Sequence, residues 1–460
     1  MNDPVLRELA DALGPDVVIP GEEADVRYWN DWAGLPPVRP KAVLRPRTVE
    51  EVSLALSVCN RRLQPVVPQG GRTGLAGAGR PSEGAIVLSL ERMNRVLEVD
   101  TANAALVAEA GVVLEAAQQA AAEAGMFLPL DLGARGSCQI GGVLATNAGG
   151  NRVIRFGMAR DNCLGLEAVL ADGTVVGGLN RLVKNNAGFD LRQLFVGSEG
   201  TLGVITRAVL KVQPEPSTTA AAFCGLRDFE AMVALLERAR ARLGGILSAF
   251  EAMWPEYYDL MIDHVQRLRA PLSGRHAMYV LLEARGYHPE SDEARFERLL
   301  ADLVAEGMVE DAALARSERD VRDFWAVRDA VAEFPILLGR HVNFDLGLPV
   351  RTMQPFVDAL RRRLPAAFPG IRAVYFGHIG DGNLHVVTGV PEGVDTHAVE
   401  DLVYRTVGEF GGTISAEHGI GTIKKPWFHL VRSAADIATM RRLKRTLDPN
   451  GILNPGKVVD

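Results

Sequence analysis

Two histidines flank a tight turn late in the chain, in the sequence AVYFGHIGDGNLHVVTGV at residues 373–390. Two β-rich runs surround Asp381-Gly382, a dipeptide that favours a two-residue hairpin turn. His378 and His385 each lie three residues from this pair, so a hairpin would place them directly opposite each other. Their Cβ atoms would then be about 4.5–5.5 Å apart on one face, and two imidazoles at that separation can bind one divalent metal ion. The alternative is a polar hairpin whose two histidines are solvated.

A carboxylate and a third imidazole, Glu417 and His418, follow a helix-like segment in the glycine-rich sequence SAEHGIG. Carboxylate oxygens and imidazole nitrogens are common ligands of zinc and related ions. Glycines let a backbone crowd a ligand, because they lack the Cβ atom that would hold it away. We therefore favour a site that joins a metal ion to a general base over a pair of solvated histidines.

The segments before this hairpin have the pattern of an α+β unit that would position it. The sequence pattern changes near residues 214–216, where this unit starts. A helix follows with Asp228 as its N-cap. A second helical pattern covers 291–306. The strand-like runs of this unit are 220–226, 246–254 and 278–284. This alternating order predicts an antiparallel sheet with helices on one face.

Three glycine-rich segments in the first half of the chain indicate a second kind of site. They are QGGRTGLAGAG at 69–79, the block at 129–157 and the block at 189–206. Backbone N–H groups in such turns can converge on an anion, for example a dinucleotide pyrophosphate, although a flexible surface loop is the alternative. Neither a Walker loop nor a Rossmann fingerprint is present, because no Gly-Lys-Ser/Thr follows and the next element is the strand AIVLSL. The small residues of the second block suit a large planar ligand.

Helix and strand patterns separate these glycine-rich segments. They predict helices over 4–13, from Thr48 onward and over 114–124, and a strand at 65–68. Glu51 lies three residues after Thr48, which is the capping-box pattern. Apolar β-patterned runs bound each segment, so the segments are not linkers.

Composition and charge exclude several classes of function. The chain has 460 residues, 47% of them hydrophobic and 23% charged, which is enough for two or three domains. Its net charge of −7 differs from the positive charge that is typical of a nucleic-acid-binding protein, so nucleic acid is not an expected partner. No run of about 18 apolar residues predicts a transmembrane helix, and the N-terminus lacks the form of a signal peptide. The four scattered cysteines predict reduced cytosolic thiols, and all nine histidines lie at His264 or later.

Six ordered motifs resemble one flavoprotein family, the FAD-dependent D-2-hydroxyacid dehydrogenases. They are PQGGRTGLAGA, GSCQIGGVLATNAGG, GSEGTLGVIT, GHIGDGNLH, SAEHGIG and DPNGILNPGK. The family includes D-lactate and D-2-hydroxyglutarate dehydrogenases and the glycolate oxidase catalytic subunit, and the resemblance runs from Pro40 to Lys457. It implies an α+β protein with a FAD-binding domain of the vanillyl-alcohol oxidase and p-cresol methylhydroxylase type at 1–214. An antiparallel-sheet α+β substrate (cap) domain would follow at 215–415, and a C-terminal segment at 416–460 would return to the flavin.

The resemblance also implies FAD bound without a covalent link. The pyrophosphate would lie against the loop at 68–78, and the isoalloxazine would lie near 137–150. Relatives that tether FAD do so through a histidine in the first glycine loop, where this chain has Arg72-Thr73. The implied cofactor-binding residues are Pro68, Gly70, Gly71, Arg72, Thr73, Gly74, Leu75, Pro129, Ser137, Gly141, Gly142, Thr146, Asn147, Gly149, Gly150, Glu199, Gly200, Gly203, Ile205 and Asn454.

For the catalytic centre, the resemblance implies that His378, His385 and Glu417 bind a divalent metal ion, with zinc expected, and that His418 is the catalytic base. A metal ion bound by the hydroxyl and carboxylate of a 2-hydroxy acid lowers the pKa of that hydroxyl, and the base takes its proton. The implied reaction is oxidation of a D-2-hydroxy acid to the 2-oxo acid with hydride transfer to flavin. Two alternatives stay open: a flavin oxidase that uses oxygen, and a metal-dependent enzyme without flavin.

The implied substrate residues depart from those of the dicarboxylate-specific relatives. Arg328 matches an arginine that those enzymes use on the distal carboxylate, but Asn343 stands where they have lysine. Ala332 and Val387 stand where they have polar side chains. A buried anion with few hydrogen-bond partners is poorly compensated for its lost hydration. We therefore expect this protein to prefer D-2-hydroxyglutarate less strongly than the dicarboxylate-specific relatives do, and to use short substrates such as D-lactate comparatively well.

The family's electron acceptors are electron-transfer flavoprotein, quinones and cytochromes, and the motifs do not choose among them. A homodimer is one expected assembly. The expected location is the cytoplasm, with peripheral association with the inner membrane as a variant of it.

Overall fold

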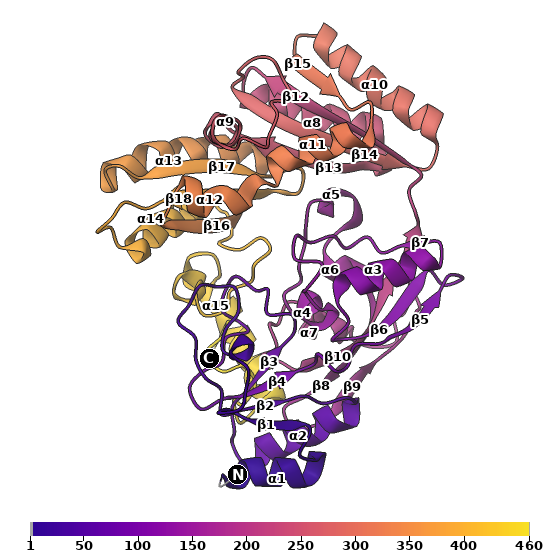
Figure 1. Cartoon of the computed structure of the whole chain (residues 1–460), viewed down its shortest axis with the longest axis vertical. Helices are drawn as coiled ribbons and strands as arrows, with labels where there is room; N and C mark the ends of the chain where they lie inside the picture. The colour runs from indigo at the N-terminus through magenta and orange to yellow at the C-terminus, as the bar shows by residue number, and fades with distance from the viewer. Residues whose placement is uncertain (1–2, 460) are drawn as a thin grey trace. The chain divides into compact units, whose positions relative to one another are not determined.

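A computed structural model describes residues 3–459, which form two compact units (Figure 1). The first unit comprises Met1–Gly150, Phe156–Glu215 and Glu417–Asp460, and the second comprises Asn151–Arg155 and Pro216–Ala416. The segment 151–155 lies inside the second glycine-rich block of the sequence, yet it belongs to the second unit.

A four-stranded mixed sheet forms one part of the first unit. Its strand order is β1 (Val18–Pro20), β2 (Ala42–Leu44), β4 (Ile86–Ser89), β3 (Val66–Gln69). The strands β2, β4 and β3 are parallel, so their carboxyl ends meet at one edge, where the loop at 70–79 leaves β3. Helices α1 (Pro4–Leu13) and α2 (Val49–Arg61) contribute apolar side chains to the same core as this sheet.

An antiparallel five-stranded sheet forms the other part of the first unit. Its order is β5 (Val96–Asp100), β6 (Ala105–Glu109), β10 (Val204–Lys211), β8 (Cys163–Val169), β9 (Val175–Gly178). A small pair joins β7 (Met126–Phe127) to β11 (Gln213–Pro214). The remaining helices around these sheets are α3 (Leu114–Glu123), α4 (Ile140–Ala145), α6 (Ala159–Asn162), α7 (Arg192–Phe195) and α15 (Ala434–Leu447). The short helix α5 (Val153–Phe156) begins in the segment 151–155 of the second unit.

Helix α2 begins where the sequence predicts, with one difference in its cap. The hydroxyl of Thr48 accepts a hydrogen bond from the N–H of Glu51 at 3.2 Å. The carboxylate of Glu51 accepts from the N–H of Arg47 at 2.6 Å rather than from the N–H of the N-cap residue itself. One half of the predicted capping box is therefore present, and the other half is displaced by one residue.

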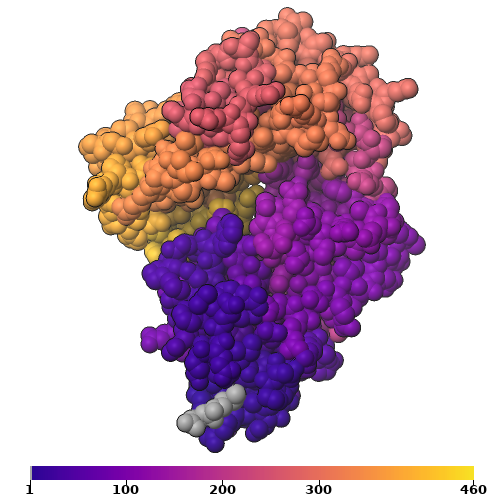
Figure 2. All heavy atoms as spheres, viewed as in Figure 1, coloured from indigo at the N-terminus to yellow at the C-terminus, as the bar shows by residue number. Residues whose placement is uncertain are grey.

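The C-terminal tail joins the first sheet. Leu453 pairs with Val66 in a parallel bridge, and the N–H of Asn454 donates to the carbonyl of Val66 at 2.8 Å. The ammonium group of Lys444 is buried and donates to the carbonyl oxygens of Thr201 and Leu453. On the face shown in Figure 2, residues from the first half of the chain form most of the surface of this unit.

The second unit contains a seven-stranded antiparallel sheet. Its order is β15 (Val309–Leu314), β12 (Thr218–Leu226), β14 (Met278–Gly286), β13 (Leu247–Met253), β17 (Arg372–His378), β18 (Asn383–Gly389), β16 (His341–Gly347). Its helices are α8 (Phe229–Leu243), α9 (Pro255–His264), α10 (Pro289–Ala305), α11 (Glu318–Arg328), α12 (Phe334–Leu337), α13 (Met353–Ala367) and α14 (Thr396–Glu409). Short 3₁₀ turns of this unit lie at Gly244–Ile246, Ala330–Glu333, Val350–Thr352 and Ile379–Asp381. Those of the first unit lie at Val26–Tyr28 and Lys425–Leu430.

Helices cover both faces of this sheet, so the prediction of helices on a single face is wrong. Side chains of α9 and α11 share a core with Phe223 and Phe376 on one face. Tyr404 of α14 packs against Phe344 with ring centroids 5.3 Å apart. Phe344 lies next to Asp345 on β16, and Asp345 pairs with His385, so Phe344 points to the opposite face. The central strands are consequently apolar on both faces, which a strand-by-strand pattern does not reveal.

Across residues 3–459, every helix is too short or too polar to cross a lipid bilayer.

Candidate active site

The hairpin at β17 and β18 has a different turn from the predicted one. Four residues, 379–382, separate the strands: a 3₁₀ turn at Ile379–Asp381 followed by Gly382 in the left-handed region at φ 91°. His385 consequently pairs with Phe376, and the prediction that it lies directly opposite His378 is wrong. His378 pairs instead with Glu251 of β13.

The two imidazoles nevertheless share a face of the sheet. The register differs from the predicted one by two residues, and side chains on a strand alternate with a period of two. The rings of His378 and His385 therefore still approach, with centroids 5.3 Å apart and planes at 84°. Both residues, together with Asp345, belong to groups of His, Asp and Glu side chains that could hold a metal ion.

A buried carboxylate from the neighbouring strand holds one of these histidines. Oε1 of Glu251 lies 2.7 Å from Nδ1 of His378, and Oε2 accepts from Nε of Arg328 at 2.7 Å. Burial alone would raise the pKa of Glu251, but the charges of His378 and Arg328 lower it to about 2. The carboxylate is therefore ionised and accepts two hydrogen bonds at once. Glu251 was not among the predicted site residues, although a single acid inside the apolar run AFEAMW is a signal that could have identified it.

Asp345 connects the second histidine to the end of the second unit. It pairs with His385 and is fully buried, and its Oδ1 accepts from Nδ2 of Asn383 at 2.9 Å. Its Oδ2 accepts from the hydroxyl of Ser415 at 3.3 Å. Ser415 is two residues before Glu417, so the chain leaves this face of the sheet just before the predicted carboxylate ligand.

The two predicted substrate residues lie in different environments. Asn343 is exposed on β16 and pairs with Val387, which places it on the same face as His385. Arg328 is the last residue of α11 and is 6% exposed, with its guanidinium turned to Glu251 and His378.

In the first unit, the glycine-rich segments interlock through backbone contacts that a side chain would block. A Cβ atom on Gly71 would lie 2.0 Å from the carbonyl oxygen of Ser137. A Cβ atom on Gly421 would lie 1.9 Å from the carbonyl oxygen of Ala76. The first loop therefore touches both the block at 137–150 and the SAEHGIG segment, which makes a continuous surface of exposed backbone.

Unusual backbone angles occur at four of the predicted cofactor residues. Arg72, Asn147, Glu199 and Asn454 have φ values of 60°, 50°, 53° and 41°, in the left-handed region that side chains disfavour. Such residues collect at ligand sites, where the surrounding structure compensates for the strain. These four positions come from all three glycine-rich blocks and the tail.

Glu199 ties the third block to the segment that carries His418. Its carboxylate accepts from the N–H groups of Ile420 and Gly421 at 2.7 and 2.8 Å, and its carbonyl oxygen accepts from Nδ2 of Asn454 at 2.7 Å. Burial raises the pKa of Glu199, and the two N–H donors act in the opposite direction. The Glu199 carboxylate thus binds the backbone N–H groups of the residues two and three positions after His418.

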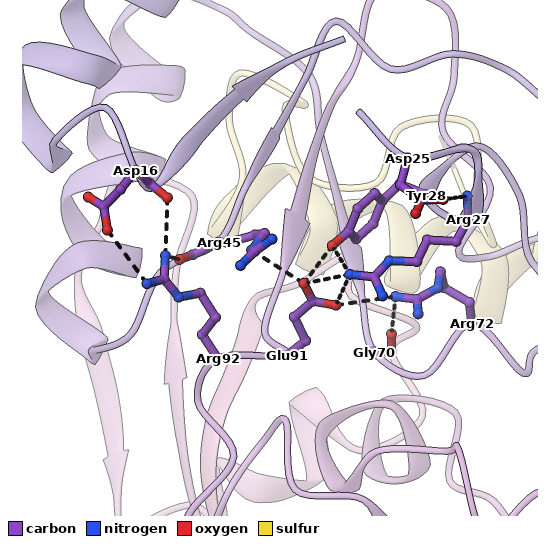
Figure 3. A network of polar contacts seen from close by, with 9 residues as sticks. All are labelled: Asp16, Asp25, Arg27, Tyr28, Arg45, Gly70, Arg72, Glu91 and Arg92. Atoms are coloured by element: carbon purple, nitrogen blue, oxygen red, sulfur yellow. Dashed lines mark hydrogen bonds and ion pairs between the residues drawn. The ribbon is translucent and has the colours of Figure 1, made fainter. Parts of the chain in front are cut away.

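Figure 3 shows how the arginine of the first loop is held. Nη1 of Arg72 lies 3.4 Å from the carbonyl oxygen of Gly70 and 4.0 Å from Oε2 of Glu91. Glu91, two residues after β4, also accepts from the hydroxyl of Tyr28 at 2.5 Å and lies 3.3 Å from Nε of Arg45. A shared acid thus restrains Arg72 at the edge of the parallel strands.

Several buried polar atoms around these segments have no hydrogen-bond partner among the described residues, namely Oε1 of Gln69, Oγ of Ser89, Oε1 of Gln139, Oγ1 of Thr422 and Oδ1 of Asn454. A buried polar atom without a partner costs free energy, so such a cluster indicates a ligand rich in hydrogen-bonding groups. The hydroxyl, phosphate and ring groups of a flavin dinucleotide fit this requirement. Cys138, in the second block, is buried, and burial raises its pKa to about 11, so its thiol is unreactive.

Two families match the chain over most of its length. Residues 40–177 match the FAD binding domain family, and residues 215–458 match the C-terminal domain of FAD-linked oxidases. Among curated relatives, the mitochondrial D-2-hydroxyglutarate dehydrogenase of Bos taurus is 43% identical over 433 residues, which is 93% of this chain and 78% of that protein. A putative mitochondrial D-lactate dehydrogenase of Schizosaccharomyces pombe is 39% identical over 451 residues, which is 95% of this chain and 85% of that protein.

Among solved structures, substrate-bound p-cresol methylhydroxylase aligns with a TM-score of 0.79 and 16% identity over 99% of this chain and 96% of that chain. At this identity the likeness concerns the fold alone. It confirms the predicted α+β fold of the vanillyl-alcohol oxidase and p-cresol methylhydroxylase type.

Proposed function

This chain belongs to the family of FAD-linked oxidases, and we propose that it is an FAD-dependent dehydrogenase that oxidises a D-2-hydroxy acid to the corresponding 2-oxo acid. The observation that carries the proposal is the identity of about two residues in five, over nearly the whole chain, to relatives named for D-2-hydroxyglutarate and D-lactate. The cofactor-fitting surface of the first unit and the paired histidines of the second support it independently.

The first unit supplies the residues that would hold FAD without a covalent link. The loop at 68–75 would take the pyrophosphate, with Arg72 restrained beside it by Glu91. The block at 137–150 would lie against the ring system, and Asn454 would offer its unpartnered Oδ1. When bound, FAD supplies a two-electron acceptor for hydride. The raised pKa of Cys138 and the absence of histidine before His264 in the sequence favour a non-covalent complex.

In the second unit, His378 and His385 would be ligands of a divalent metal ion, completed by Glu417. Two imidazoles and a carboxylate, with one open position, are the donor set of catalytic zinc sites, so zinc is the expected ion. When bound, such an ion lowers the pKa of a coordinated substrate hydroxyl. The hydrogen bond between Asp345 and Ser415 supports this set, because it holds the chain two residues before Glu417 next to His385.

His418 would act as the general base. It would accept the proton of the substrate hydroxyl while the hydrogen on the adjacent carbon leaves as hydride. Glu199 would keep this base in position, because it binds the backbone of Ile420 and Gly421.

For the substrate side chain, we propose Asn343 as a contact, because it is exposed on the face that carries His385. An amide neutralises less charge than the lysine of dicarboxylate-specific relatives, so D-lactate and similar short acids should be used well in comparison with D-2-hydroxyglutarate. Arg328 is the second proposed substrate residue, because its guanidinium lies beside His378, with Nη2 3.1 Å from Nε2 of that imidazole.

The remaining parts of the proposal concern the cell. Electron-transfer flavoprotein, a quinone or a cytochrome would reoxidise the flavin, and a homodimer is the proposed assembly. The proposed location is the cytoplasm, with peripheral contact with the inner membrane as its variant. Oxygen as the acceptor would instead make the enzyme an oxidase, and hydrogen peroxide formed at the rate of turnover would identify that case.

Anaerobic reduction tests the central proposal. The purified protein should be yellow, and D-lactate or D-2-hydroxyglutarate should bleach its flavin absorbance while the L-enantiomers leave it unchanged. Acid precipitation should release all of the flavin into the supernatant. A colourless protein, or a flavin that neither D-acid reduces, would refute the assigned reaction.

A further inference from the structure

Residues 149–158 form a loop, called the anchored loop below, that leaves the second glycine-rich block and returns to it. Two hydrogen bonds close its base. The N–H of Ala159 donates to the carbonyl oxygen of Ala148 at 2.9 Å. The N–H of Arg160 donates to Oδ1 of Asn147, also at 2.9 Å. Asn147 has a strained φ of 50° and is one of the residues proposed to contact FAD, so the base of the loop is part of the proposed flavin surface.

The tip of the anchored loop belongs to the second unit. The segment Asn151–Arg155 is part of that unit, whereas Gly150 and Phe156 on either side belong to the first unit. Nε of Arg152 donates to Oε1 of Glu283 at 2.9 Å, and Nη2 donates to Oε2 at 3.2 Å. These two hydrogen bonds form the fork by which an arginine binds a carboxylate most firmly.

Glu283 is a buried anion that depends on this arginine. It lies on β14 and is 1% exposed. Burial alone would raise its pKa, but the charge of Arg152 and the hydrogen bonds from Arg152, Ser248 and Trp325 lower it. Ser248 and Trp325 are neutral donors, so Arg152 supplies the positive charge in this group. If the loop left the sheet, the remaining donors would offer Glu283 no countercharge, and a buried ion in that state is strongly unfavourable.

Arg155 fixes the loop to the end of the same strand. Its Nη1 donates to the carbonyl oxygen of Arg285, and its guanidinium carbon lies 5.7 Å from the ring centroid of Tyr287. A guanidinium at this distance over an aromatic face is attracted to it. The anchored loop thus has two arginines bound to β14 and to the residue that follows it.

Between the two arginines, Ile154 packs against the turn that joins β17 to β18. A Cβ atom on Gly380 would lie 2.5 Å from Cδ1 of Ile154, so the isoleucine occupies the space that a side chain at this position would need. Nη2 of Arg240 donates to the carbonyl oxygen of Gly380 at 2.6 Å and also holds the turn. Gly380 lies two residues after His378 and five before His385. The loop therefore contacts the turn that joins the two histidine strands.

We propose that the anchored loop couples the flavin-facing block to the hairpin of His378 and His385, with Arg152 and Ile154 as positioning residues. The coupling runs through the continuous backbone, because the base of the loop holds Asn147 and its tip holds the hairpin turn. Detachment of the tip would release both ends at once. The proposal rests on the proposed function, in which this block contacts FAD.

Arg152→Met tests the coupling in the FAD-loaded protein. A charged hydrogen bond changes an equilibrium about 10- to 100-fold, so the loop should open more often by that factor. Hydrogen exchange of the peptides 146–160 and 376–384 should accelerate by one common factor, since a single opening exposes both. FAD dissociation, followed by flavin fluorescence after dilution, should accelerate too, because the cofactor would leave when its backbone surface opens. Arg152→Lys keeps the charge without the fork and should give intermediate rates.

Ser248→Ala is the matched control. The hydroxyl of Ser248 donates to Oε1 of Glu283 at 2.8 Å, so this variant removes a hydrogen bond from the same carboxylate without touching the loop. Both peptides and FAD dissociation should keep their wild-type rates. In every variant, the peptide 309–314 from the edge strand β15 should exchange as in the wild type, which excludes a general loss of stability.

Ile154→Ala tests the second contact without uncovering a charge. It should accelerate exchange of both peptides by about tenfold, because the packing on Gly380 is lost. Arg152→Met leaves Glu283 without its countercharge. If flavin content or circular dichroism shows that this variant has lost its fold, the double variant Arg152→Met/Glu283→Gln replaces it.

The outcomes separate the coupling from the proposed function. Faster exchange at 146–160 with an unchanged peptide 376–384, in the Arg152 and Ile154 variants, overturns the coupling. Wild-type exchange in both peptides overturns the positioning role of the substituted residue. A wild type that binds no FAD contradicts the proposed function alone, because the exchange of the two peptides measures the coupling without the cofactor.

Discussion

Glu199→Gln perturbs the contact between the third glycine-rich block and the segment that carries His418. The wild-type carboxylate accepts two backbone hydrogen bonds, from Ile420 at 2.7 Å and Gly421 at 2.8 Å, and it is 6% exposed. The amide of glutamine has one oxygen, so one N–H group loses its acceptor and faces an NH₂ donor instead.

The magnitude follows from the bond that is lost. A hydrogen bond to a charged group contributes about 1.5–3 kcal/mol. Burial raises the pKa of Glu199, so ionising this carboxylate already costs part of that amount, and the neutral amide recovers it. We therefore expect the lower half of the range, about 1.5–2 kcal/mol, which is roughly a 10- to 30-fold change in a local opening equilibrium.

Hydrogen exchange of the peptide that contains residues 415–424 measures this opening directly. Protection of the Ile420 and Gly421 amides should fall by that factor, whereas peptides from the second unit should exchange at wild-type rates. Flavin reduction by substrate should slow as well, since the proposed base His418 lies two residues from Ile420. Unchanged protection at these amides would refute the assignment of Glu199 as the anchor. A loss of FAD affinity without a change in exchange would indicate a direct cofactor contact instead.

Three further predictions follow from the described geometry. His418→Asn should keep FAD and bound metal yet slow flavin reduction about 10²–10⁴-fold in stopped-flow absorbance, and a normal rate would contradict its role as base. Asn343→Lys should raise kcat/KM for D-2-hydroxyglutarate relative to D-lactate by about tenfold or more, because a charged hydrogen bond becomes available on the face of His385. An unchanged ratio of the two kcat/KM values would show that Asn343 does not contact the substrate. Burial lowers the pKa of Lys457 to about 8, so between that value and the ordinary lysine pKa of about 10.4 the unfolded chain binds more protons and stability should rise with pH. The Tm of the wild type minus that of Lys457→Met should therefore increase from pH 8 to pH 10, and a flat difference would contradict the shift.

The sequence by itself determined the local elements and the kind of chemistry. Helix α2 begins after Thr48 and helix α8 after Asp228, because side-chain caps act on the next few residues only. The face shared by His378 and His385 was also predictable, since an even change of register leaves a side chain on the same side of the sheet.

Only the tertiary structure decided the partners of those residues. His378 meets Glu251, which is 127 residues away in the chain, and no local pattern encodes a pairing over that distance. The strands of the hairpin are joined by a four-residue loop at 379–382 instead of the predicted two-residue turn. This loop is a 3₁₀ turn followed by Gly382 in the left-handed conformation. Arg328, whose role as a substrate residue stays a prediction, has a buried ion pair with Glu251 that no local sequence pattern indicates. Periodicity and capping act over a few residues, whereas the pairing of buried charges depends on which strands become neighbours, and that is settled when the sheet assembles.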